Sequence, residues 1–458
     1  MITIKSIAAC AILTGASGLF GIQSVQAGIP IEHWTQASGV QVYLVQSPGI
    51  PMVDVQIDFD AGSRRDPADQ AGLASVTASM TAKGVLARAN GDAALDENAL
   101  SEAWADLGAS FGAGASGDRM SFSLRSLTYP DLLAKAVQLA ARQLGEPAFP
   151  QAVWLNERER LNAAIKESNT RPATLAARAF NAAVYGQHPY GYDMTEATLA
   201  RIGVADMKAT YNRLILPCRA KVTMVGAVNR AQADSLVTLL FSRLNPAALG
   251  GTAGAPGACP ALPAVVEVLP LDKASEQRIA FDSAQAHVLM GQPGFKRDDP
   301  DFFALTVGNY ILGGGGFVSR LTNEVREKRG LSYSVYSYFA PGLHAGAFTV
   351  GLQTRPDQAS QAVQVSREVV ASFVANGPTD AELVAAKDNL MGGFALRIDS
   401  NRKLLDNVTN IAWNKLPLDY LDTWTQRVEK VTAADIQKAF ARQLQPARMV
   451  TVVLGGTP

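Results

Sequence analysis

The sequence has few of the side chains that hold metal ions or build disulfide frameworks. It contains three cysteines and four histidines in 458 residues. The histidines are widely separated along the chain, and no two of them have the spacing of a metal-binding motif. We therefore expect no metal site built from neighbouring histidines. The four histidines are His33, His188, His287 and His344.

An excess of charge is also lacking, because 41 basic residues balance 41 acidic ones. Without a broad basic surface, nucleic acid is not expected as a partner. No stretch beyond the N-terminal segment has the length of a membrane span, so no membrane span is expected after that segment is removed. The apolar share of 48% is ordinary for a globular protein with a large core.

The N-terminal segment has the pattern of a secretory signal peptide. Lys5 precedes an apolar run at Ile7–Ile22, and Val25 and Ala27 place small residues where a signal peptidase reads them. The sequence therefore predicts a signal peptide at 1–27 and export, to the periplasm if the source is a Gram-negative bacterium. A retained anchor is the alternative, but the apolar run is short and interrupted by Gly and Ser.

Two cysteines remain after the expected cleavage. Cys10 leaves with the signal peptide, whereas Cys218 and Cys259 enter a compartment that permits disulfides. The sequence does not settle whether they form a bridge, because nothing in it fixes the distance between them.

An internal repeat divides the chain. In Val204–Gly226 an aspartate, a proline and a glycine occur at intervals that recur in Val431–Gly455, 229 residues later. Each copy has a capping signal, an amphipathic helix ended by proline, and a β-branched strand. Two copies of so long a unit do not make a solenoid, so the repeat indicates a duplicated domain.

The expected fold class is α+β, with two homologous α/β-sandwich domains that each carry an antiparallel sheet backed by helices. The Gly/Pro/Ala-rich segment 246–264 is the expected linker, and it would permit hinge motion. The domains are then 28–245 and 265–458. Within them we expect strands at 41–44, 53–59, 120–125, 221–225, 286–291, 332–338, 347–352 and 449–454. Helices are expected at 73–82, 97–106, 132–144, 154–166, 302–312, 357–374, 380–398 and 433–444.

Three local motifs and the repeated strand ends together resemble the pitrilysin family of zinc peptidases, which includes insulinase and mitochondrial processing peptidase. The motifs lie at Gly62–Ser75, Tyr185–Asp193 and Gly308–Ser337. The resemblance covers nearly the whole mature chain. It implies repeated α+β domains, arranged as one half of a clamshell that closes around an unfolded peptide.

In active members of that family, a helix carries His-x-x-Glu-His, so that two imidazoles on one face bind zinc and the Glu serves as general base. The matching positions here are Ser75, Ala78 and Ser79. A further Glu ligand maps near Ala164, although a small register error would bring Glu159 or Glu167 there instead. The resemblance therefore implies a degenerate zinc motif, no metal in this chain and no peptidase activity by the chain alone.

The second half matches a different part of the family pattern. Arg326 and Tyr333 correspond to an arginine and a tyrosine that reach the peptide from the half without zinc ligands. A guanidinium can hold a carbonyl through several donors, and a phenol can donate to a developing oxyanion. Without the motif match, an ordinary salt bridge and a core tyrosine would explain both residues. Gly313–Gly316 is interpreted as a tight turn and His188 as a structural residue.

Two functions are consistent with these features. The first is a substrate-gripping subunit of a heterodimeric zinc metallopeptidase that degrades unfolded peptides, in which a homologous partner supplies the His-x-x-Glu-His motif and the zinc. The second is a non-catalytic peptide-binding or scaffold protein of the same fold, in which Arg326 and Tyr333 would have no role in catalysis.

Overall fold

The structure is a computed structural model that describes residues 28–88, 91–244 and 259–456. The expected signal peptide at 1–27 lies outside these residues, as does most of the linker expected at 246–264. Within the described ranges, no helix is both long and apolar enough to cross a membrane. The domain boundaries expected at 28–245 and 265–458 stay a prediction.

The first half of the chain forms a six-stranded sheet in the order β1-β2-β8-β3-β7-β6. All neighbours are antiparallel except β2 and β8, which are parallel. The strands are β1 (Glu32–Thr35), β2 (Gln41–Gln46), β3 (Met52–Phe59), β6 (Ser110–Ala115), β7 (Met120–Leu127) and β8 (Lys221–Gly226). A separate two-stranded ribbon pairs β4 (Gly84–Val85) with β5 (Leu95–Asp96).

Helices of the same half cover one face of this sheet. The largest apolar core joins strand residues such as Phe59 and Phe122 to side chains of α1, α3, α7 and α8. The helices of this half are α1 (Leu73–Met80), α2 (Glu97–Asp106), α3 (Pro130–Gly145), α4 (Gln151–Ser168), α5 (Pro172–Tyr185), α6 (Glu196–Ala200), α7 (Val204–Leu214) and α8 (Arg230–Leu240).

The second half forms a five-stranded sheet in the order β11-β12-β10-β13-β9. Its strands are β9 (Ser275–Ile279), β10 (Ala286–Pro293), β11 (Val335–Phe339), β12 (Ala347–Thr354) and β13 (Val450–Leu454). Here β13 and β9 are the parallel pair. The helices are α9 (Phe302–Asn309), α10 (Ala359–Asn376), α11 (Asp380–Gly392), α12 (Asn401–Trp413), α13 (Tyr420–Lys430) and α14 (Ala433–Gln443). The expected fold class, sheets backed by helices, is confirmed; one parallel pair in each sheet is the difference.

The internal repeat is visible in the structure. Helices α1 and α9 begin at residues 73 and 302, α5 and α12 at 172 and 401, and α7 and α14 at 204 and 433, so each pair is 229 residues apart. At the start of α7 the Asp206 carboxylate accepts a hydrogen bond from the Gly203 backbone N–H at 2.8 Å, and at the start of α14 Asp435 accepts one from the Thr432 backbone N–H at 2.9 Å. Each is followed by a proline turn and by a strand, β8 or β13, that pairs parallel to one neighbour and antiparallel to the other.

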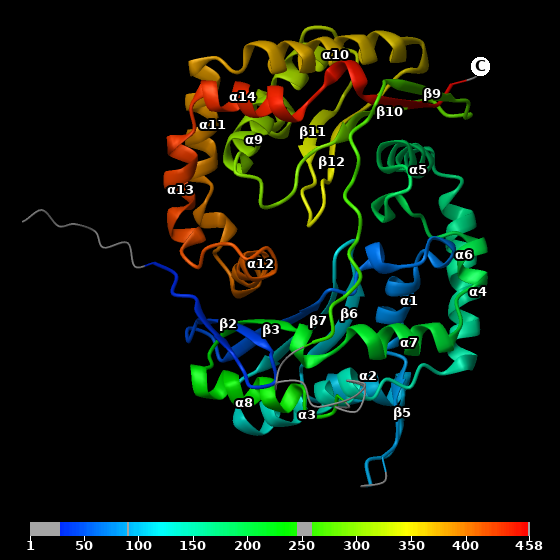
Figure 1. The fold of residues 1–458 in the computed structure, drawn as a ribbon, viewed down its shortest axis with the longest axis vertical. Helices are drawn as coiled ribbons and strands as arrows, with labels where there is room; N and C mark the ends of the chain where they lie inside the picture. Colours follow the sequence, from blue (N-terminus) through cyan, green and yellow to red (C-terminus); the bar gives the residue numbers. More distant parts are fainter. Residues whose placement is uncertain (1–27, 89–90, 245–258, 457–458) are drawn as a thin grey trace, which may run out of the picture.

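The two halves exchange one helix. Helix α5 of the first half packs on β10 and β13 of the second sheet, and α12 of the second half packs on β8 and β3 of the first sheet (Figure 1). Each sheet is therefore covered on one face by its own helices and on the other by a helix from the opposite half. The buried residues Phe180 and Val452 belong to the first contact, and Val225 and Val408 to the second.

Polar contacts add to this packing between the halves. The Asp118 carboxylate accepts hydrogen bonds from the Tyr190 hydroxyl at 2.5 Å and from the Leu343 amide of the second half at 2.9 Å. Lys221 on β8 donates to the carbonyl of Ala412 at 2.8 Å and to that of Trp413 at 3.1 Å, at the C-terminus of α12. The two Lys221 bonds thus bring a positive charge to the C-terminal end of α12, where a cation is favourable.

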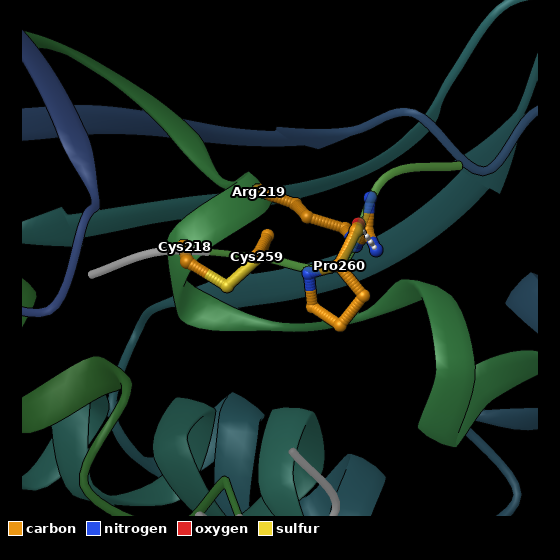
Figure 2. Close-up of a disulfide and its surroundings, with 4 residues drawn as sticks. All are labelled: Cys218, Arg219, Cys259 and Pro260. Carbon is orange, nitrogen blue, oxygen red and sulfur yellow. Dashed lines mark hydrogen bonds between the residues drawn. A yellow bond between two sulfur atoms is a disulfide. The ribbon is translucent and has the colours of Figure 1, made fainter. Parts of the chain in front are cut away.

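Cys218 and Cys259 form a disulfide with their Cα atoms 5.6 Å apart (Figure 2). Cys218 lies in the proline turn before β8, and Cys259 is where the described chain resumes after residue 258. Beside the bridge, the guanidinium of Arg219 donates to the Pro260 carbonyl at 2.5 Å (Figure 2). The structure thus answers the question that the sequence left open, and it fastens the chain entering the second half to the first half.

Candidate functional site

The residues just before helix α1 fix its position. Gly72 has φ +103°, a conformation that favours glycine, and a Cβ there would collide with the Met194 side chain. The Asp66 carboxylate accepts hydrogen bonds at 3.0 Å from the backbone of Gly72 and at 3.0 Å from that of Ala74. Burial raises the pKa of Asp66 to about 7, although these backbone N–H groups act in the opposite direction. The motif before α1 therefore serves to anchor the helix.

The face of α1 that would carry zinc ligands has no donor set for zinc. Ser75 and Ser79 are exposed one turn apart on the same face, and the Ser79 hydroxyl donates to the helix backbone at 3.0 Å. Ala78 is buried and offers no carboxylate. Ala164 is an exposed residue of α4. Neutral hydroxyls and methyl groups do not bind zinc as imidazole, thiolate or carboxylate do, so these residues do not fit the metal.

The two alternative glutamates do not supply the missing site. Glu159 and Glu167 are both exposed on α4, and Glu167 pairs with Arg171. In the described part of the chain, no group of three His, Cys, Asp or Glu side chains is arranged to hold a metal ion.

A lysine follows the residues that match the zinc motif, Ser75, Ala78 and Ser79. Lys83 lies four residues after Ser79, and its ammonium is 2.7 Å from a Glu97 oxygen and 3.1 Å from a Glu157 oxygen. Glu157 belongs to α4 and lies two helical turns before Ala164, on the same face. An ion pair therefore links the turn after α1 to α4.

The structure brings Arg326 and Tyr333 together. The Arg326 guanidinium carbon is 4.9 Å from the ring centre of Tyr333 and 4.7 Å from that of Phe317. Both rings are largely exposed, at 83% for Tyr333 and 72% for Phe317. The only carboxylate near Arg326 in the described residues is that of its neighbour Glu327, at 3.4 Å. The side chain makes no hydrogen bond to the described residues, so its donors remain available to a ligand.

Phe317 was not predicted as part of this group. It follows the glycine run Gly313–Gly316. Gly313 and Gly314 end a π-helical continuation of α9 (Tyr310–Gly314), so the turn expected for the whole run is confined to Gly315 and Gly316, before the short 3-10 segment Gly316–Val318. A Cβ on Gly313 would come within 2.5 Å of the Ser337 backbone nitrogen, and Gly316 has φ +61°. The glycines therefore allow the turn to approach β11 and to present Phe317 beside Arg326.

Two histidines that are far apart in the sequence are neighbours in the structure. The ring centres of His188 and His344 are 5.1 Å apart at the contact between the halves. His188 is buried, and its Nδ1 accepts a hydrogen bond from the Tyr190 backbone at 3.1 Å, which caps a short 3-10 turn. The structural role expected for His188 is confirmed. Burial and the proximity of His344 lower its pKa.

Together, the fold and the site define a class of protein: a duplicated metallopeptidase-type chain whose α1 helix carries no metal ligands. Comparison with protein-family models supports this reading. Residues 41–198 match the model for insulinase (peptidase family M16), and residues 201–390 match the model for the peptidase M16 inactive domain. The chain belongs to peptidase family M16.

A solved relative has the same architecture, and two further relatives match in part of their sequence. The crystal structure of a peptidase M16 inactive domain from Pseudomonas fluorescens is 32% identical, covers 93% of this chain and 98% of its own, and superposes with a TM-score of 0.84. An uncharacterized zinc protease of Streptomyces coelicolor is 35% identical over 39% of this chain and 38% of its own length. The non-peptidase homolog YmxG of Helicobacter pylori is 35% identical over 36% of this chain and 38% of its own length. The chain thus matches little more than a third of these two relatives.

Proposed function

We propose that this chain is the substrate-gripping subunit of a heterodimeric zinc metallopeptidase that degrades unfolded peptides. A homologous partner would supply the His-x-x-Glu-His motif and the zinc, and this chain would supply Arg326 and Tyr333. The partner would close over this chain like the second half of a clamshell, with the peptide between them.

The observation that carries the proposal is the contrast between the two equivalent halves. The first half has lost every metal donor on α1, whereas the second half keeps an arginine with free donors in contact with an exposed tyrosine. A guanidinium whose carboxylate partner among the described residues is its exposed neighbour Glu327, and an exposed phenol, contribute little to stability in this chain alone. We therefore attribute their positions to contacts with another molecule. A planar guanidinium can bind a peptide carbonyl, and a phenol can stabilise an oxyanion.

The test is to measure zinc content and cleavage of an unfolded peptide by the mature chain alone and after mixing with the His-x-x-Glu-His homologue from the same organism. We expect neither zinc nor cleavage from the chain alone, and cleavage that appears or rises on mixing. In the mixture, Tyr333→Phe should lower kcat about 100-fold, because it removes one donor to the oxyanion. Arg326→Ala should lower kcat/KM.

Matched controls separate this role from general damage. Arg329→Ala removes an arginine of the same segment that is already paired with Glu324 at 2.7 Å, and Tyr129→Phe alters another exposed tyrosine. Both variants should retain full activity in the mixture. Stoichiometric zinc and cleavage by the chain alone, or full activity of the Arg326 and Tyr333 variants in the complex, would refute the proposal.

We also propose that the protein acts after export, in the periplasm if the source is Gram-negative. The Cys218–Cys259 bridge supports this location, because structural disulfides persist in oxidising compartments and are rare in the cytosol. Recovery of the protein with both thiols free from its native compartment would contradict it.

A second candidate is a non-catalytic peptide-binding or scaffold protein. The observation in its favour is that a relative matching part of this chain is named a non-peptidase homolog. This candidate predicts that the chain binds peptides but does not alter cleavage by any zinc-motif homologue. Failure of the two chains to associate or to affect each other's activity would favour it.

A further inference from the structure

A cleft lies where α5 crosses the second sheet. It has a volume of about 290 Å³ and opens beside the edge strand β11. Small residues of α5, Ala173, Ala176 and Ala177, form one side. They recur at helical spacing, so one face of α5 leaves space above the sheet instead of filling it with larger side chains.

Two tyrosines of β11 form the opposite wall. Tyr336 and Tyr338 point to the same side of the sheet, and their rings are stacked with centres 6.0 Å apart. A Cβ on Gly351 of β12 would come within 2.5 Å of the Tyr336 ring, so that glycine allows the ring to lie flat across the sheet. Both tyrosines remain almost half exposed, at 43% and 45%. An aromatic surface is thus available to a ligand.

Three polar side chains line the cleft without a hydrogen-bond partner among the described residues. Asn181, His287 and Gln353 line it, and none of these side chains makes a hydrogen bond to the described residues. His287 and Gln353 lie opposite each other on adjacent strands. Burial lowers the pKa of His287, which favours its neutral imidazole. None of the described lining residues is an Asp, Glu, Lys or Arg.

The size, position and chemistry of the cleft limit its occupant. A volume of about 290 Å³ is at the small end of ligand pockets, which suits one large side chain but no folded segment. The absence of charge in its described lining disfavours an ionic group, which would lose its hydration without gaining a partner. The aromatic wall and free amides suit a ring with a polar edge, such as an indole or a phenol. Ser334 in the lining directly follows Tyr333 in the sequence, so the lining begins one residue after the candidate substrate residue.

We propose that this cleft binds a neutral aromatic side chain of the same peptide that contacts Arg326 and Tyr333, and thereby sets a substrate preference. The proposal rests on the proposed function, whose peptide it places in a second, side-chain-selective contact. A peptide extended along β11 would carry its aromatic residue into the cleft while its backbone stays within reach of the arginine.

The test uses the mature chain alone and measures the binding of flexible Gly/Ser peptides that carry one central Trp, Leu, Glu or Lys. We expect the Trp peptide to bind about tenfold or more tightly than the others, because an aromatic ring buries a large area in such a cleft. Ala177→Leu should fill the cleft and remove this preference. Tyr338→Ser, which removes part of the aromatic wall, should reduce it as well.

The matched control is Ala163→Leu, which adds the same side chain to an exposed position of α4 away from the cleft. It should leave the preference for Trp unchanged. Equal affinities for the four peptides, or a preference that survives both Ala177→Leu and Tyr338→Ser in folded protein, would overturn the proposal. Free N-acetyl-tryptophanamide binding as tightly as the Trp peptide would overturn the assignment to a peptide, leaving a site for small aromatic molecules.

The outcome is distinguishable from failure of the proposed function. The binding assay requires neither a partner nor catalysis, so the cleft can be occupied even if mixing with a zinc-motif homologue has no effect. Arg326→Ala should weaken all four peptides by a similar factor, whereas Ala177→Leu should affect only the aromatic one.

Discussion

The disulfide gives the most direct test of how the two halves are connected. Replacing both Cys218 and Cys259 by serine removes the bridge and changes little else, because each substitution exchanges sulfur for oxygen in a small side chain. The folded structure should persist, since the halves remain joined by α5 and α12. The main effect is expected in the unfolded chain, which loses a cross-link and gains conformational freedom.

The magnitude follows from the length of the closed loop. The bridge joins residues 41 positions apart in sequence. In the chain-entropy model, closing a loop of that length stabilises the folded state by about 4 kcal/mol at 25 °C. Native-state relaxation can lower this figure, so the double-serine variant should lose up to about 4 kcal/mol of unfolding free energy.

Urea unfolding followed by circular dichroism measures this loss. The parent protein in its oxidised form should unfold at a higher urea midpoint than the double-serine variant. Its m-value should be lower, because the cross-linked unfolded chain exposes less surface. Adding a reductant should bring the parent to the midpoint of the variant and leave the variant unchanged. Equal midpoints for the oxidised parent and the variant would refute the reasoning.

Three further outcomes are expected. Burial lowers the pKa of Lys221 from 10.5 to about 8. Because the unfolded chain binds the extra proton between these pH values, the unfolding free energy of the parent should rise by at most about 3 kcal/mol from about pH 8 to about pH 10.5. The Lys221→Gln variant should lack this rise, and parallel pH profiles of the two proteins would contradict the prediction. Phe180→Ala should lower the unfolding free energy by about 3–5 kcal/mol and split thermal unfolding into two transitions, because Phe180 lies in the contact between the halves. The matched Phe373→Ala, in the core of the second half, should lower it by a similar amount without splitting the transition. Burial and His344 hold the pKa of His188 below 6.5, so stability should fall as pH drops below 6.5, and His188→Gln should reduce this acid sensitivity in urea titrations.

Local signals predicted much of the fold. The repeated helices α7 and α14 could be located because their caps, apolar spacing and terminal prolines are all encoded within a short segment. The expected helix at 97–106 matches α2 in both of its bounds. Strand β3 was also found, because its β-branched residues distinguish it from a helix.

Features that depend on distant contacts could not be predicted in this way. Helix α5 is rich in alanine, and its position is set by the sheet of the opposite half. Strand β6, with the sequence SFGAGA, has little strand propensity and is held by pairing with β7. The bridge between Cys218 and Cys259 required a distance that no spacing in the sequence provides.

The candidate site likewise has residues that the sequence predicted and contacts that it could not predict. The degenerate positions Ser75, Ala78 and Ser79 and the pair Arg326 and Tyr333 were found through a motif. The contact of Arg326 with Phe317 was not, because it depends on how the glycine turn approaches β11. Similarly, the proximity of His188 to His344 arises only when the halves pack together.

The exchange of α5 and α12 bears on how the chain arose and how it must be made. Because these helices are equivalent in the repeat, two unfused copies of the ancestral domain would each have covered the partner's sheet, as in a two-fold symmetric dimer with swapped helices. Gene fusion would then have turned an intermolecular contact into an intramolecular one. During synthesis the first sheet stays uncovered on one face until Asn401–Trp413 has been made, so either half produced alone presents an apolar surface prone to association.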